Sequence, residues 1–182
     1  RTASRPSFRR ISDVPLRATL MNTSPVRVRI FYPADPLGVV PGGVDTFLRG
    51  LIKFAPEDLE FSLVGMTTDE AARPVGRWTR CHIGSRSFDF FPVVAMKNAG
   101  SRGKVPLSVR YMLALKSQLA GLRSDFDVFD FHRIEPSLLF GADSRPKNFY
   151  FHNDPQTLRL SASDNLWKYA PFIYERLERK AM

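Results

Sequence analysis

Residues 26–54, VRVRIFYPADPLGVVPGGVDTFLRGLIKF, join a short apolar strand to an amphipathic helix through a loop that ends in two glycines. In the strand, Val26, Val28 and Ile30 alternate with arginines, which is typical of a β-strand. After the loop, apolar residues recur at the spacing of one helix face: Val44, Phe47, Leu48, Leu51, Ile52 and Ala55. Glycines between a strand and a helix are how α/β proteins bring backbone N–H groups up to a phosphate or a sugar. The stretch therefore predicts a β-loop-α unit with a ligand at its loop.

The rest of the chain continues this alternation of strands and helices. Further strands are predicted at 60–66, 88–95, 126–132 and 147–152, and further helices at 106–122, 136–140 and 166–181. Residues 67–87 are expected to form a loop, and Pro92 weakens 88–95 as a central strand. The order indicates an α/β fold with a doubly wound, mainly parallel, Rossmann-like sheet and helices on both faces.

Length and composition favour one globular domain. A chain of 182 residues, 43% of them hydrophobic, can build one sizeable core. Residues 1–24 are rich in Arg, Ser, Thr and Pro without periodicity, so we expect a flexible basic lead-in before a single domain at 25–182. No stretch has the length and apolarity of a membrane span or a signal peptide. The single cysteine, Cys81, cannot form an internal disulfide, which fits a reducing compartment.

The net charge of +9 comes mainly from two blocks of the sequence. Residues 1–30 contain seven arginines against one aspartate, and residues 71–104 contain seven arginines or lysines against one aspartate. Such blocks are typical of a solvated surface, and they also suit an anionic partner such as a phosphate-bearing substrate, an acidic membrane or a nucleic acid. The hypothesis of a nucleic-acid partner rests on charge alone. Aromatic residues could stack on bases, but most of the 15 phenylalanines lie in apolar stretches that indicate a core.

Polar groups suited to chemistry follow three predicted strands. Gly42 and Gly43 precede a helix start, where N–H groups and the helix dipole favour an anion, although glycines there also serve turn geometry. His132 and His152 end two later strands, and each can bond a hydroxyl or a phosphate or be purely structural. Because the carboxyl ends of parallel strands meet at one edge, these groups are expected at one edge of the sheet. Dinucleotide, P-loop, zinc-ligand and GxSxG motifs are absent from the sequence.

Four segments, in this order, resemble the N-terminal domain of retaining GT-B glycosyltransferases of the group 1 class. PGGVDTFLRGLIKF resembles the family's Gly-Gly-Val-Glu/Asp loop and first helix, and FDVFDFHRIEP resembles its Asp-Val-x-x-x-His segment with a downstream Glu-Pro. FYFHNDP is similar to the strand with a second His and an Asp, and NLWKYAPFIYERLERKAM to the helix before the second domain. The resemblance covers residues 26–182.

The resemblance implies roles for individual residues. His132 would be the catalytic residue that contacts the transferred hexose near its anomeric carbon. The residues implied to contact the donor or the substrate are Gly42, Gly43, Asp45, Arg133, His152 and Asp154. An anionic or lipid-linked acceptor, or a membrane face, would meet Arg73, Arg77 and Arg80. No metal and no cofactor are expected, since the nucleotide-sugar is a co-substrate.

The reaction implied is transfer of a hexose from a nucleoside diphosphate sugar to an acceptor hydroxyl with retention, in polysaccharide or glycolipid synthesis. In the family a C-terminal domain holds most of the nucleotide-sugar, and that domain is absent from this sequence, so we expect a half-enzyme that is inactive alone. The expected location is the cytoplasm, with peripheral contact at the inner face of the membrane. The alternative is a non-catalytic α/β module that binds a nucleotide or a sugar.

Overall fold

The structure, a computed structural model, describes residues 24–38, 42–96, 105–150 and 152. These residues form a six-stranded sheet in the order β3-β4-β2-β1-β5-β6. The parallel strands are β1 (Val26–Phe31), β2 (Leu59–Thr67), β4 (Arg86–Ala95), β5 (Val128–Phe131) and β6 (Lys147–Phe149). At one edge, β3 (Thr79–Ile83) runs antiparallel to β4. The predicted α/β fold with a mainly parallel sheet is confirmed.

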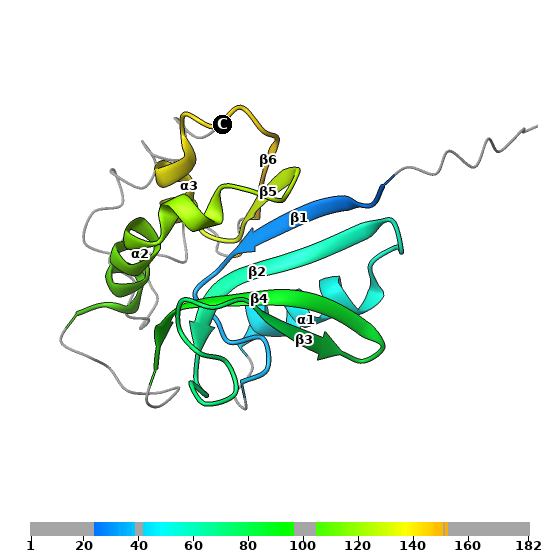
Figure 1. The fold of residues 1–182 in the computed structure, drawn as a ribbon, viewed down its shortest axis with the longest axis horizontal. Coiled ribbons are helices and arrows are strands. Elements are labelled where there is room, and N and C mark those ends of the chain that lie inside the picture. Colours follow the sequence, from blue (N-terminus) through cyan, green and yellow to red (C-terminus); the bar gives the residue numbers. More distant parts are fainter. Residues whose placement is uncertain (1–23, 39–41, 97–104, 151, 153–182) are drawn as a thin grey trace, which may run out of the picture.

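Helices cover both faces of the sheet (Figure 1). The helix α1 (Gly43–Phe54) buries Leu48 and Ile52 on one face. On the opposite face, α2 (Leu107–Ser117) buries Tyr111 and Leu115. That second face also carries the 3₁₀ turns η1 (Leu119–Leu122) and η2 (Leu138–Phe140), and between β5 and β6 the chain forms the short helix α3 (Ile134–Ser137). Apolar stripes at helical spacing produce this two-sided cover, because each stripe needs a sheet face to bury it.

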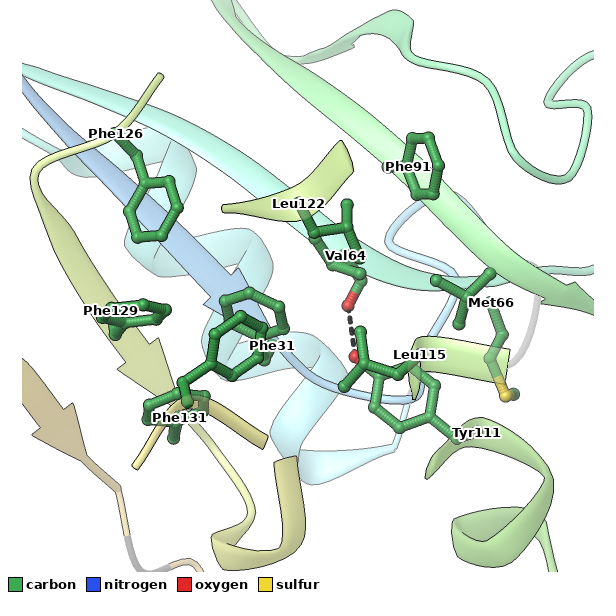
Figure 2. Packing of buried hydrophobic residues seen from close by; sticks show 12 residues of the cluster. Phe31, Val64, Met66, Phe91, Tyr111, Leu115, Leu122, Phe126, Phe129 and Phe131 are labelled. Atoms are coloured by element: carbon green, nitrogen blue, oxygen red, sulfur yellow. Dashed lines mark hydrogen bonds between the residues drawn. The ribbon is translucent and has the colours of Figure 1, made fainter. Parts of the chain in front are cut away.

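Aromatic side chains fill the core between the sheet and α2 (Figure 2). The ring of Phe31 lies 5.3 Å from that of Phe131 and 4.8 Å from that of Phe140, measured between ring centroids. The hydroxyl of Tyr111 donates a 2.7 Å hydrogen bond to the carbonyl of Val64, which satisfies the polar end of a buried side chain. The phenylalanines of the strands are core residues, as the sequence predicts.

The path of the chain places a topological switch point between β1 and β5. From β1 the chain adds β2 and then β4 on one side, and it returns to place β5 and β6 on the other side of β1 (Figure 1). In open α/β sheets, the loops that leave such neighbouring strands diverge at their carboxyl ends, and ligands bind in the space between them. The carboxyl ends of β1 and β5 therefore mark the place to look for a site.

The region predicted as a loop at 67–87 is partly wrong, because it contains β3. This strand pairs with β4 from Thr79 opposite Phe90 to Ile83 opposite Arg86. Gly84, with a φ of +62°, makes the tight turn between the two strands. Two turn residues, a glycine and a serine, between two short runs rich in β-formers indicate a β-hairpin. The first of these runs is polar, so its strand is difficult to recognise in the sequence.

Pro92 lies in an internal strand and still leaves the sheet intact. Strand β3 pairs with β4 only as far as Phe90, so on that side Pro92 lies beyond the last paired residue. Its carbonyl accepts a 2.9 Å hydrogen bond from the N–H of Gly76. On the other side the register of β2 and β4 shifts between Gly65 and Met66, which is an irregularity of the kind that accommodates proline.

Several predicted elements differ from the structure at their ends. The predicted helix 106–122 divides into α2 and η1, and the predicted strand 126–132 is shortened to β5. The predicted helix at 136–140 begins two residues earlier, at Ile134. Residues 1–23 of the expected lead-in at 1–24, and the predicted helix 166–181, lie outside the described residues. Among the helices described, none combines the length and apolarity that crossing a bilayer requires.

Candidate functional site

Two histidines meet beyond the carboxyl ends of β5 and β6. The Nδ1 atom of His132 lies 2.8 Å from the Nε2 atom of His152, a hydrogen-bond distance. The ring of Tyr150 stacks on His132 with centroids 4.6 Å apart, and Phe47 of α1 contacts both histidine rings at 5.4 to 5.7 Å. We call Phe47, His132, Tyr150 and His152 the histidine site. The sequence expectation that His132 and His152 lie at one sheet edge is confirmed.

Strand alternation explains why these rings gather on the α1 face. Side chains two residues apart in a strand share a face, so His132, directly after β5, lies on the same side as Asp130 within β5. Tyr150 and His152 follow β6, and their rings lie nearly parallel with centroids 6.3 Å apart. In the parallel pair β5 and β6, Asp130 lies opposite Asn148, and the N–H of Tyr150 continues the ladder to the carbonyl of Phe131 at 2.9 Å. This register places the rings of His132 and Tyr150 side by side.

The glycine pair lies at the start of α1, and a side chain from the first turn of the same helix caps it. Gly42 is the N-cap residue, and its N–H donates a 2.8 Å hydrogen bond to the carboxylate of Asp45. A negative charge is therefore already present at the helix N-terminus, where the sequence predicts contact with a phosphate. Gly43 is exposed and lies in the first turn, where backbone N–H groups have no partner within the helix. One oxygen of the Asp45 carboxylate thus accepts the bond from Gly42, and the other, Oδ1, is buried without a hydrogen-bond partner in the described part of the chain.

Burial separates the two histidines. The side chain of His132 has no exposed surface, and its Nε2 atom lies 3.8 Å from a carboxylate oxygen of buried Asp130. His152 is half-buried, and partial burial together with the neighbouring His132 lowers its pKa. Phe47 keeps 42% of its surface exposed. The surface of the histidine site is therefore formed by Phe47 and by the half-buried rings of Tyr150 and His152, while His132 lies beneath them.

A tyrosine and an ion pair border the histidine site. The ring of Tyr32 meets that of His132 edge to face at 6.2 Å, and burial, with the charge of Asp45, raises the pKa of Tyr32 to about 12. Arg133, which the resemblance assigns to substrate contact, forms a 2.6 Å ion pair with Glu135. The phenol of Tyr32 is neutral, and the charge of the Arg133 guanidinium is balanced by Glu135. Both residues can form hydrogen bonds, and together they add little net charge beside the site.

The three arginines assigned to an anionic acceptor do not form one surface. Arg73 is buried and forms a 2.9 Å ion pair with Asp35, so it belongs to the protein interior. Arg77 is exposed. Arg80 is exposed and pairs with Asp89 at 3.0 Å across β3 and β4. Of the three, Arg77 is the arginine for which the structure records exposure and no ion pair.

Arg80 borders a hollow far from the histidine site. An open groove of about 240 Å³ lies at the amino ends of β1, β2 and β4, where parallel strands begin rather than end. Its walls carry both signs of charge, from Arg27, Arg29, Glu57, Glu60, Arg80, Arg86, Asp89 and Asp125. In folds of this class ligands collect at the opposite edge of the sheet. We therefore place the candidate site at the histidines.

Asp35 anchors the loop that leaves β1 towards α1, and its ionisation makes the free energy of unfolding depend on pH. Burial raises the pKa of Asp35, but hydrogen bonds from Thr68, Leu37 and Arg73 outweigh it and hold the pKa below its ordinary value. The ionised carboxylate therefore stabilises the fold above about pH 4, and this contribution is lost as the pH falls through the folded pKa. We expect Asp35→Asn to lower the free energy of unfolding by about 1–3 kcal/mol at neutral pH.

Urea unfolding between about pH 3 and pH 7 measures this effect. Asp35→Asn should also flatten the fall of stability in acid, because the titrating group is gone. Asp58→Asn, at an exposed position in the turn before β2, is the matched control and should leave both quantities near those of the wild type. An unchanged acid dependence in Asp35→Asn would contradict this role of Asp35.

The sequence expectations omit three residues that build the site. Asp130 and Tyr150 each stand two positions before a histidine in a strand, and Phe47 stands one helical turn after Gly43. Strand and helix periodicity were the signals that could have identified them. Asp127, the aspartate of the motif that resembles the family's, pairs instead with Arg27 at 3.1 Å, at the amino ends of β5 and β1.

Two further expectations concern Asp154 and a metal ion. Asp154 lies outside the described residues. Within the described ranges, no three or more His, Cys, Asp or Glu side chains are grouped so that they could hold a metal ion.

Comparison with known proteins identifies the type of fold. The structure is similar to sucrose-phosphate synthase from Thermosynechococcus elongatus, with a TM-score of 0.54 and 10% sequence identity. The match covers 86% of this chain and 40% of that chain, so this chain spans less than half of the protein it resembles. No family model and no curated protein sequence matches. At this identity the likeness concerns the fold alone, which is a Rossmann-like α/β fold.

Proposed function

We propose that this chain is the acceptor-side half of a retaining GT-B hexosyltransferase of the group 1 class. The complete enzyme would transfer a hexose from a nucleoside diphosphate sugar to an acceptor hydroxyl, in the synthesis of a polysaccharide or glycolipid. The observation that carries the proposal is the His132–His152 pair at the switch point of a glycosyltransferase-like fold. Fold alone does not define an activity, so the chemical groups at this site must account for the function.

The groups at the site suit a ligand rich in hydroxyls. Aromatic rings of Phe47 and Tyr150 offer apolar faces, on which the C–H faces of a sugar can pack. The imidazole of half-buried His152 can accept or donate a hydrogen bond. Positioning and charge stabilisation by such groups can supply much of the rate enhancement in group transfer.

A second domain would complete the cleft and hold most of the nucleotide. The chain covers 40% of the matched sucrose-phosphate synthase chain, which leaves room for such a domain in proteins of this fold. We propose that the acceptor is a carbohydrate or a lipid-linked sugar, and that exposed Arg77 supports contact with an anionic acceptor or the inner membrane face. No cofactor or metal enters this proposal.

A transfer assay tests the function. The whole gene product and the 182-residue chain are each incubated with nucleoside diphosphate hexoses and a panel of sugar acceptors. We expect transfer with retention, read from the anomeric signals in NMR, for the whole product and none for the chain alone. His152→Ala should lower kcat/KM about 10- to 160-fold, the effect of losing a hydrogen bond worth about 1.5–3 kcal/mol.

The third described histidine provides the control. His82 lies exposed on β3, away from the histidine site, so His82→Ala should keep the activity of the wild type. Sugar transfer by the 182-residue chain alone would refute the half-enzyme proposal. Binding of nucleotide-sugars by the whole product without any transfer would instead favour the non-catalytic binding module.

A further inference from the structure

We propose that the groove at the amino ends of β1, β2 and β4 is a second ligand site, which binds a small zwitterion, a molecule that carries both a carboxylate and an ammonium group. In this site Arg29 holds the carboxylate, and the exposed carboxylates of Glu60 and Asp125 attract the ammonium group. The groove lies at the sheet edge opposite the histidine site. The proposal is therefore independent of the proposed function.

Strand alternation and register place polar side chains along the groove. Val28 and Ile30 of β1 pack in the core on the α1 side, so Arg29 between them points to the other face. Across the sheet, Arg29 lies opposite Ser62 of β2, and Ser62 lies opposite Asp89 of β4. On this face α2 lies towards the carboxyl ends of the strands, and polar side chains occupy the amino-terminal half (Figure 1).

The guanidinium of Arg29 is held by contacts that leave one of its nitrogens free. Its carbon lies 4.7 Å from the ring centroid of Trp78 and 4.4 Å from that of Phe126. Its Nε–H donates to the hydroxyl of Ser62 at 3.0 Å, and Nη1 donates to two backbone carbonyls before β5 at 3.0 and 2.8 Å. The Nη2 atom has no hydrogen-bond partner among the described residues, and it is not one of the fully buried atoms that lack a partner. Its two N–H groups therefore remain for a ligand in the groove.

The positive charge of Arg29 has no carboxylate beside it. The residue is only 4% exposed, and no ion pair within the described part of the chain includes it. Burial lowers the pKa of Arg29 to about 10, so the guanidinium is still charged at neutral pH. A charge removed from water without a counter-ion is costly, and an anion that enters the groove recovers part of this cost. This is the physical reason to expect a carboxylate at Nη2.

The other three arginines of the groove are engaged by the protein itself. Arg27 and Arg80 each form an ion pair with an aspartate, at 3.1 and 3.0 Å. Arg86 is half-buried and donates hydrogen bonds to two backbone carbonyls, at and just before the start of β2, at 2.8 and 2.9 Å. Buried Arg29 is therefore the guanidinium with most to gain from an added anion.

Three carboxylates select a ligand that also carries a positive charge. Glu57, Glu60 and Asp125 line the groove, are exposed, and form no ion pair with any residue that the structure describes. They repel a second negative charge on a ligand and attract an ammonium group. Glu60 precedes Ser62 by two residues, so its backbone lies diagonal to that of Arg29 at roughly 8 Å. A carboxylate and an ammonium group joined by a short chain can meet both side chains.

NMR titration of the 182-residue chain with three probes of similar size tests the site. The probe 4-aminobutyrate carries both charges, butyrate carries only the carboxylate, and butylamine carries only the ammonium group. We expect 4-aminobutyrate to shift the Nε–H signal of Arg29 and the amide signals of Glu60 and Ser62. Its Kd should be about 5-fold or more below those of butyrate and butylamine, the gain from one added ion pair at a partly exposed site. Inorganic phosphate should bind more weakly than 4-aminobutyrate.

Two glutamate variants distinguish the ammonium contact from a general effect of charge. Glu60→Gln should weaken the binding of 4-aminobutyrate about 2- to 5-fold and should not weaken that of butyrate. Glu70→Gln is the matched control, because Glu70 is exposed and follows the carboxyl end of β2, away from the groove. Arg29→Gln should remove the binding of both carboxylates. Since that variant also loses buried hydrogen bonds and can unfold, the two glutamate variants provide the decisive comparison.

Each outcome bears on a separate part of the proposal. Binding of butyrate or inorganic phosphate as tight as that of 4-aminobutyrate would overturn the assignment of a zwitterion. Arg29 signals that none of the probes moves would overturn the site itself. Equal losses of affinity in Glu60→Gln and Glu70→Gln would refute the ammonium contact. The sugar-transfer assay concerns the histidine site, so its result leaves this test standing.

Discussion

Replacing Gly65 by alanine is expected to destabilise the domain by about 3 kcal/mol or more, the upper end of what overpacking costs. Gly65 lies near the carboxyl end of β2, where the chain leaving β1 passes close to it. A Cβ atom added there would collide with the backbone carbonyl of Ala34 and would lie 2.9 Å from the ring of Phe90. The neighbouring N–H of Met66 bonds that same carbonyl at 3.0 Å, so the loop cannot retreat without losing a hydrogen bond.

Equilibrium unfolding in urea measures the Gly65→Ala effect. Gly50→Ala is the matched control, since Gly50 lies within α1 with no atom near the position of a new Cβ. Alanine is favoured over glycine in a helix by about 0.5–1 kcal/mol, so this variant should be as stable as the wild type or slightly more stable. Equal stability of the two variants would show that the close approach at Gly65 is unimportant.

Phe31→Ala is expected to lower the free energy of unfolding by about 3–5 kcal/mol, the usual cost of removing a fully buried phenylalanine. Phe31 ends β1 with no exposed surface, and its ring contacts those of Phe129, Phe131 and Phe140. The alanine side chain would leave a cavity between the sheet and α2, which Figure 2 shows packed with aromatic rings. The loss should appear as a lower denaturation midpoint with an unchanged m-value.

Two further phenylalanine variants distinguish the cost of a buried cavity from the cost of losing an apolar side chain at any position. Phe31→Leu keeps most of the volume and should cost clearly less than Phe31→Ala. Phe54→Ala removes an equally large ring at a position that is 76% exposed and should stay within about 0.5 kcal/mol of the wild type. Similar losses for Phe31→Ala and Phe54→Ala would contradict the assignment of Phe31 to the core.

Local pattern was enough for the elements with a clear period. The alternation in 26–31 and the helical stripe from Val44 predict β1 and α1 almost to the residue. The pattern fails where tertiary contacts decide: β3 forms because β4 offers it an edge, and Pro92 is tolerated because β3 ends before reaching it. Sequence periodicity carries no information on which neighbour will satisfy a given backbone group.

For the site, the sequence indicates which histidines lie at the carboxyl edge and leaves their roles open. His132 and His152 look equivalent in the sequence, since each ends a predicted strand. The structure separates them, because the register of β5 and β6 buries one ring under Tyr150 and leaves the other half-buried. Arg73 and Arg80 likewise look alike, yet one forms a buried ion pair and the other an exposed one.

The amino-acid sequence by itself determined the fold class, because the periods of apolar residues are local properties that each strand or helix carries within itself. The β-loop-α unit of residues 26–54 already contains its strand, its glycines and its helix. Only the tertiary structure decided that α1 presents Phe47 to two histidines, and that the ring of Tyr150 stacks on His132. The contacts of Phe47 with the two histidines join residues far apart in the chain, and they depend on strand order and register, which no single segment specifies.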